Sequence, residues 1–234
     1  MRSVRVSMLS LLLSATLTTS VAVAAQPQRM EVTSAGAFAD LPMQGALADA
    51  VKNLVEGYGV AVAFGTDKAP MLKPELALTR GDLVQWLSAT ADWVMQSVAD
   101  SPSEAIEQMP LSRAPICAGS GWRAVRDLKA VADFDATAPW ASALKNLLNR
   151  YEITVVAEQG FAADTPVTVA EAQACLASFD PNIKLAGKQD AAVTREAFII
   201  GLSQALDVHA QLASALVEAT DKKQQAERRA RRMQ

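Results

Sequence analysis

The sequence contains one histidine and two cysteines among its 234 residues, and aromatic side chains make up only 5%. These counts are too low for the usual Cys/His zinc sites, a c-type haem or an iron–sulfur cluster. The lone His209 has no nucleophile pattern beside it, and no Gly-x-Ser-x-Gly, His-Glu-x-x-His or phosphate-loop motif occurs. We therefore expect no metal, no cofactor and no enzymatic activity. The catalytic alternative is a pair of distant carboxylates of the kind found in glycosidases.

Positive charge is also scarce, except at one end of the chain. Lys and Arg number 22 against 25 Asp and Glu, a formal charge of -3, so an overall nucleic-acid binder is not expected. Residues 26–220 hold 14 basic and 23 acidic side chains, whereas residues 221–234 hold six basic and two acidic ones. This basic tail is expected to contact anionic lipid, peptidoglycan or an acidic partner. The alternative is that it is a solvated helix end with no partner.

The N-terminal segment reads as an export signal. Arg2 and Arg5 precede an apolar stretch that ends in small residues at positions 23–25. This pattern predicts a signal peptide over residues 1–25 with cleavage near Gln26, and no transmembrane segment after cleavage. A membrane anchor is the alternative, although seven Ser and Thr residues dilute the stretch. We expect an exported protein, periplasmic or associated with the cell envelope.

Export would place the two cysteines in an oxidising compartment, where disulfides form and persist. Cysteines in an oxidising compartment often pair, so Cys117 and Cys175 are a candidate disulfide. By the loop-entropy model such a bridge would add about 4 kcal/mol of stability. Two separately buried thiols are the alternative.

A duplication is the main internal signal. Residues 37–60, AFADLPMQGALADAVKNLVEGYGV, return 93 residues later as residues 130–153, AVADFDATAPWASALKNLLNRYEI. In both copies apolar residues recur every three or four positions, which is the period of a helix with one buried face. Recurring units usually pack against their copies. The sequence therefore predicts an all-α, mainly helical protein, in which helix-loop-helix units form a compact bundle with a C-terminal helix.

Three hydroxyl residues are placed to begin helices. Thr79 and Thr168 each stand three residues before a carboxylate, Asp82 and Glu171 respectively, which is the spacing of a capping box. Thr194 begins a third such segment, but there the glutamate comes one position early. Each threonine is expected to accept a backbone N–H that the first turn leaves unpaired.

Tryptophans offer flat faces on which sugar rings stack, but most of them are expected in the core. Trp86 and Trp140 lie on the apolar helical stripes. Trp122, among glycines and arginines, is expected to be the most exposed.

The order of these elements resembles the S-layer homology family over about 110 residues. The family's repeat opens with Phe-x-Asp, continues into a helix and a Gly/Asp/Phe/Pro loop, and closes with an Ile-Thr-Arg-Ala-Glu-Phe helix start. This sequence departs from that pattern with Gly81 for alanine, Val169 for arginine and Glu196 one place early. The matching segments are Phe38–Asp40, Leu78–Leu83, Asp133, Phe161, Val167–Glu171 and Val193–Phe198.

The resemblance implies three repeats packed with pseudo-threefold symmetry that hold an exported protein to an anionic glycan. It divides the chain into a first repeat (37–100), a linker or helix (101–129), a second repeat (130–180), a partial third repeat (181–210) and the basic tail (211–234). The third repeat has no convincing first helix unless residues 123–130 supply it. Arginines at helix starts suit a carboxylate or phosphate, so the expected ligand-binding residues are Thr79, Arg80, Thr194 and Arg195.

The alternative for both arginines is that they pair with surface carboxylates. The function expected from the sequence is non-covalent binding to cell-wall polysaccharide or peptidoglycan, with envelope proteins as further partners of the basic tail. The alternative is a periplasmic scaffold or adaptor that has lost glycan affinity and binds another protein.

Overall fold

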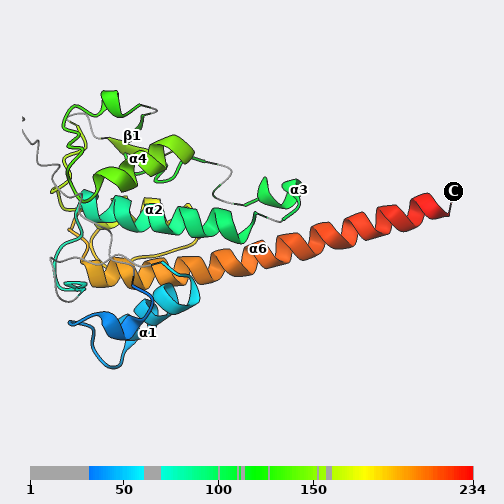
Figure 1. Cartoon of the computed structure of the whole chain (residues 1–234), viewed down its shortest axis with the longest axis horizontal. Coiled ribbons are helices and arrows are strands. Elements are labelled where there is room, and N and C mark those ends of the chain that lie inside the picture. Colours follow the sequence, from blue (N-terminus) through cyan, green and yellow to red (C-terminus); the bar gives the residue numbers. More distant parts are fainter. Residues whose placement is uncertain are drawn as a thin grey trace, which may run out of the picture.

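The computed structural model describes residues 32–60, 70–99, 101–109, 111, 114–125, 127–151, 153–156 and 160–233. The predicted signal peptide lies outside these residues. The described chain is mainly helical, as the sequence predicts (Figure 1). Its α-helices are α1 (Ala46–Lys52), α2 (Arg80–Ser97), α3 (Ser103–Ile106), α4 (Ala141–Arg150), α5 (Val169–Leu176) and α6 (Arg195–Arg232).

Shorter elements complete the fold. A π-helical turn, η2 (Asn53–Gly57), extends α1, and 3-10 turns form at η1 (Ala35–Ala37) and η4 (Leu128–Ala130). Strands β1 (Arg123–Ala124) and β2 (Thr154–Val156) pair antiparallel. Since residues 123–124 form β1 and residues 128–130 form a 3-10 turn, this segment does not supply a first α-helix for the third repeat.

The first helix of each copy packs against a helix from a different unit. Helix α4 lies along α2, which closes the first repeat, and α1 lies along α6, the last helix of the chain (Figure 1). Helix α5 in turn contacts α6. The packing therefore links the units around the molecule and joins residues that are more than 100 positions apart.

Three short segments form a closed ring of backbone hydrogen bonds just before α2, α5 and α6. The amide of Leu78 donates to the Val193 carbonyl (2.8 Å), Val193 donates to Val167 (2.9 Å), and Val167 donates back to Leu78 (2.8 Å). All three residues are buried. Each participant is at the same place in its unit, one residue before the capping threonine. The ring therefore places the three helix starts side by side around a pseudo-threefold axis.

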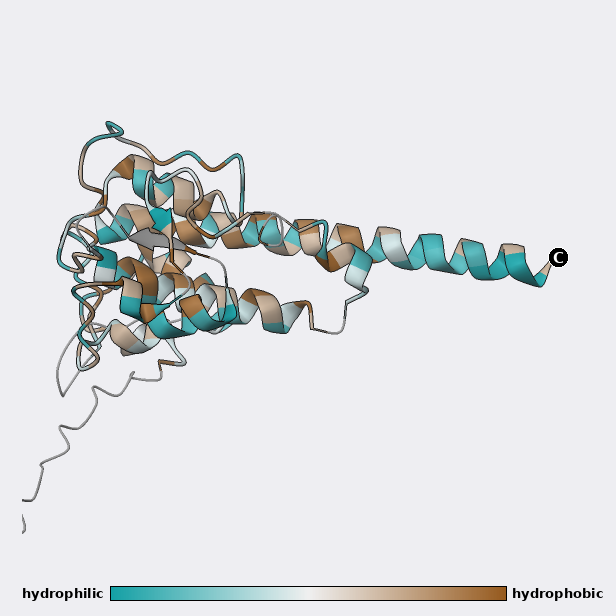
Figure 2. Cartoon of the chain, turned by 90° about the horizontal axis from the view of Figure 1, so that it is seen from above, coloured by the Kyte–Doolittle hydropathy of each residue, from teal (hydrophilic) through white to brown (hydrophobic). Residues whose placement is uncertain are grey.

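Helix α6 extends beyond this body. It spans 38 residues, and its far end carries the C-terminus away from the other helices (Figure 1). That end is coloured as hydrophilic, whereas the part within the body alternates between apolar and polar (Figure 2). No helix in the described part of the chain is long and apolar enough to cross a membrane.

Candidate functional site

The predicted helix caps form. The Thr79 hydroxyl accepts the Asp82 amide and the Asp82 carboxylate accepts the Thr79 amide, both at 3.2 Å, which completes a capping box at the start of α2. Thr168 and Glu171 form the same box at the start of α5. Thr194 accepts the Ala197 amide at 3.2 Å at the start of α6. The capping role of Asp82, Thr168 and Glu171 is therefore confirmed.

Arg195 does not face solvent. It is only 8% exposed, and its Nε and Nη2 atoms donate to the Oδ2 atom of Asp82 at 3.0 and 2.7 Å. Its Nη1 atom points to the Leu72 carbonyl at 3.5 Å. Asp82 therefore has two roles, since it caps its own helix and pairs with an arginine from the helix start of another unit.

We call each contact between two neighbouring helix starts a seam. Arg80 makes the same kind of contact at the seam between α2 and α5. Its Nη2 atom lies 3.4 Å from Oε1 of Glu171, and its Nη1 atom donates to the Phe161 carbonyl at 3.2 Å. The guanidinium carbon lies 5.0 Å from the centre of the Trp122 ring, a cation–π distance. The Trp122 indole in turn donates to the same Glu171 oxygen at 2.7 Å. Trp122 is therefore buried, at 8% exposure, and the expectation that it is exposed is wrong.

The arginines thus join repeats to one another, which corrects the prediction that they contact a glycan. Arg80 and Arg195 are both buried, and their charged groups are directed at carboxylates inside the protein. The carboxylates belong to the capping boxes and not to the surface, so the alternative of surface pairing is also wrong. Thr79 and Thr194 act as caps of the same turns.

The third seam lacks both charges. The position that corresponds to Arg80 and Arg195 is Val169, and the position that corresponds to Asp82 and Glu171 is Ala197. A cation without its acid, or an acid without its cation, would be buried and unpaired here, at a cost of several kcal/mol (about 3–5). The two apolar residues avoid this cost, which explains why Val169 departs from the arginine of the resembled family.

Two aspartates hold the loops of the duplicated units. The Asp40 carboxylate accepts the amides of Leu72 and Lys73, and the Asp133 carboxylate accepts those of Phe161 and Ala162, at 2.7 and 2.6 Å. Burial raises the pKa of Asp133, but the two amide donors, with its own backbone N–H and the charge of Arg80, outweigh burial and leave the pKa below its usual value. The second residue of each loop pair has a positive φ, 49° for Lys73 and 50° for Ala162. The aspartates therefore stabilise matching tight turns.

The polar contacts of α1 with α6 are repeated between α4 and α2. Asn53 donates to Asp207 and to the Ser203 hydroxyl, both at 2.9 Å, and Tyr58 donates to Asp207. Burial and the carboxylate raise the Tyr58 pKa to about 12, because both disfavour the phenolate. In the second copy, Asn146 and Tyr151 make the corresponding bonds to the acid and the serine of α2, Asp92 and Ser88.

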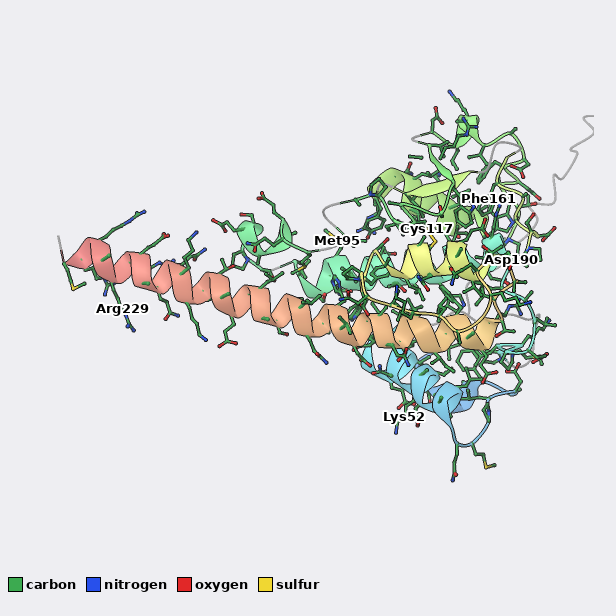
Figure 3. The ribbon with its side chains drawn as sticks, turned by 180° about the vertical axis from the view of Figure 1, so that it is seen from behind. Lys52, Met95, Cys117, Phe161, Asp190 and Arg229 are labelled. Atoms are coloured by element: carbon green, nitrogen blue, oxygen red, sulfur yellow. A yellow bond between two sulfur atoms is a disulfide. The ribbon has the colours of Figure 1, made fainter. Side chains whose placement is uncertain are left out.

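Cys117 and Cys175 form a disulfide, as the export argument proposed. The bridge joins the segment after α3 to helix α5 across 58 positions of sequence (Figure 3). The Cys117 amide also donates to the Ser178 hydroxyl at 3.2 Å. The linker therefore lies on α5, which brings Trp122 to Glu171.

An open groove lies where the two copies meet. It has a volume of about 1000 Å³ and runs between the start of α2, the segment Asp133–Trp140 and the loop Ala162–Pro166. The close approach of Trp140 to the start of α2 requires Gly81, because a Cβ there would lie 3.0 Å from Cδ1 of Trp140. The Trp140 ring is half-buried and packs on Phe161, with ring centres 4.6 Å apart.

The groove is rich in hydrogen-bond acceptors and has no lysine or arginine among its lining residues. Asp82 and Asp133 are already occupied by the contacts described above. Asp135 and Asp164 are exposed, although Oδ1 of Asp135 accepts the amide and the hydroxyl of Thr137 at 2.8 and 2.7 Å, and Gln85 also lines the groove. This chemistry fits hydroxyl, amide or ammonium groups, and it disfavours the anionic ligand that the arginines suggested.

Sequence reasoning missed Gln85, Asp135 and Asp164, although it singled out other residues that line the groove for other roles. The available signal was the pair Asp133 and Asp135 just before Trp140 within the duplicated stretch. No group of three or more histidine, cysteine, aspartate or glutamate side chains suited to a metal ion occurs in the described residues. No family model, curated protein or solved structure matches the chain.

Proposed function

We propose that the protein is exported and binds a cell-envelope glycan, either wall polysaccharide or peptidoglycan, without covalent chemistry. The observation that carries the proposal is the groove between the two copies. It combines exposed acceptors, Asp135 and Asp164, with the flat surfaces of Trp140 and Pro139. Carboxylates bind sugar hydroxyls, and aromatic rings pack on the apolar faces of sugars.

The part of the glycan that enters the groove is then neutral or amine-bearing. An anionic group would meet two exposed carboxylates and no cation on the groove wall. The disulfide supports the export half of the proposal, because such bonds persist in oxidising compartments.

Sedimentation with purified peptidoglycan sacculi or wall polymer tests the proposal. The double variant Asp135→Asn with Asp164→Asn removes two acceptor charges from the groove. The matched control, Glu104→Gln with Glu107→Gln, removes two exposed charges from the α3 segment, outside the groove. We expect wild type and control to sediment with the polymer and the groove variant to remain in solution.

Salt separates this mode from an electrostatic one. Contacts to a neutral sugar survive high salt, whereas attraction between exposed charges is screened. Sedimentation that disappears at high salt and is unaffected by the groove variant would contradict the proposal. No sedimentation at any salt would favour the scaffold or adaptor alternative.

A further inference from the structure

Only the first part of α6 belongs to the body of the protein. Between Arg195 and His209 the helix has nine buried residues, whereas beyond His209 only Thr220 is buried. Helix α3 packs on α6, and Gln224 is the last half-buried side chain. From residue 225 to residue 233 every side chain is exposed. The final turns therefore gain no stability from packing on the described part of the chain.

This exposed end carries the positive charge that the rest of the chain lacks. We define the distal segment as residues 221–233, which hold six basic and two acidic side chains. Among the described residues, Lys222 pairs with Glu218, both largely exposed, and the four arginines have no carboxylate partner. Arg229 extends from the ribbon away from the body (Figure 3). The arginines of the segment are Arg228, Arg229, Arg231 and Arg232.

The arginines of the distal segment and its apolar side chains take different sides of the helix, whereas Lys223 lies beside the apolar ones. At about 100° per residue, the four arginines spread over roughly 160° of the circumference. The opposite side carries small or flexible apolar residues, at 219, 226, 230 and 233. The alanine side is too weakly apolar to bury the helix deeply in lipid, so the attraction of its arginines to anionic headgroups would supply the binding.

A groove on another protein fits this segment less well. Helix-in-groove recognition needs large apolar anchors at i, i+3, i+4 and i+7, whereas the i+3 position after Ala226 is Arg229 and the apolar residues of this end are three alanines and one exposed methionine. A parallel pairing of two copies would bring two basic segments together. Arginine instead suits phosphate, because its planar group donates two parallel hydrogen bonds.

The helix also keeps the acidic body away from such a surface. From His209 to Arg232 an α-helix rises about 35 Å, at about 1.5 Å per residue. Charges are screened over about 8 Å at physiological salt. The net negative charge of residues 26–209 is therefore screened before it reaches the distal segment.

We propose that the distal segment of α6 is an electrostatic anchor that binds the surface of an anionic phospholipid membrane. It lies on the headgroups without crossing the bilayer. This anchor is independent of the glycan groove, since it is at the other end of the molecule.

Flotation with vesicles tests the anchor, using the full chain. Vesicles of phosphatidylcholine mixed with phosphatidylglycerol are compared with vesicles of phosphatidylcholine alone. An apolar N-terminal stretch would bind both kinds, so the difference between them isolates the effect of charge. We expect flotation only with the mixed vesicles, and we expect high salt to abolish it.

A matched pair of variants locates the site. Replacing the four arginines of the distal segment with glutamine keeps good helix formers and should weaken vesicle binding by roughly a hundredfold or more. The control replaces four exposed basic residues of the body with glutamine and should bind as wild type. Its positions are Arg123, Lys129, Lys145 and Lys188.

Several outcomes would overturn the proposal. Equal loss in both variants would show an effect of net charge, and no loss in either would place binding elsewhere. Binding to soluble polyphosphate without flotation would identify a free polyanion as the ligand. Absence of both would leave an acidic protein as the partner. The groove variant Asp135→Asn with Asp164→Asn should float normally, so failure of the glycan proposal is distinguishable from failure of this one.

Discussion

The buried pair between Arg195 and Asp82 provides the sharpest test of how the repeats hold together. Both side chains are 9% exposed, and two donors of the arginine converge on one carboxylate oxygen. Replacing Arg195 with valine leaves the carboxylate buried without its cation, which should cost about 3–5 kcal/mol of unfolding free energy. Replacing Asp82 with alanine should cost a similar amount, because it removes the carboxylate that pairs with the buried guanidinium and also removes a helix cap.

The double variant should be much less destabilised than the two losses together. Arg195→Val with Asp82→Ala reproduces the residue types that the protein itself has at the third seam, Val169 and Ala197. We expect a coupling free energy of about 2–3 kcal/mol between the two positions. Chemical denaturation of wild type, both single variants and the double variant measures it, provided that the denaturant slope stays constant.

An exposed pair serves as the control cycle. Lys222 and Glu218 are 72% and 69% exposed, so their coupling should not exceed about 0.5 kcal/mol. If the two single losses at Arg195 and Asp82 simply add, to within about 0.5 kcal/mol, the pair does not stabilise the seam and the reasoning is refuted.

Two further predictions concern the turns and the core. Gly160 has φ of 115°, and a Cβ added there would lie 2.7 Å from Oδ1 of Asp133. In chemical denaturation, Gly160→Ala should therefore lose about 1–3 kcal/mol more unfolding free energy than the control Gly45→Ala, where φ is 110° but the space is open. Equal losses in the two variants would show that the clash is relieved. Burial lowers the pKa of His209, and the Phe179 backbone offsets this only in part. At this residue the unfolded chain therefore binds more protons just below pH about 6.5, so the contribution of His209 to the unfolding free energy should be constant above that pH and fall below it, by at most about 1.4 kcal/mol per pH unit. His209→Gln should remove this slope in urea titrations at several pH values, and an unchanged slope would assign it to other groups.

Local chemistry explains what the sequence predicts well. The starts of α2, α5 and α6 are confirmed at Thr79, Thr168 and Thr194, since a capping box is decided by residues three positions apart. The helices of the duplicated stretch also form, because their apolar period is local. The first one is shorter than its pattern suggests and passes into a π-helical turn at Asn53.

Long-range pairing explains what it predicts badly. Arg80 and Arg195 look available in the sequence, because their carboxylate partners lie 91 and 113 positions away. Trp122 looks exposed among glycines, yet the disulfide holds its segment on α5 and its indole meets a buried carboxylate. The deciding contact joins two repeats for the arginines and joins the linker to the second repeat for Trp122, and no pattern within one repeat contains it.

The duplication nevertheless constrains which residues can stand at the first and third positions of each helix start, because these positions pair between repeats. The start of α2 offers an arginine to one neighbour and a carboxylate to the other, whereas α5 offers only a carboxylate and α6 only an arginine, so a change at one position must be matched in a different repeat. Val169 and Ala197 are 28 positions apart and belong to different helices, yet together they form the uncharged counterpart of the two ion pairs. The departure at Val169 is therefore no sign of a lost ligand site. The ion pairs and the backbone hydrogen bonds join the helix starts in one closed ring, and the groove beside Trp140 is where we propose that a ligand binds.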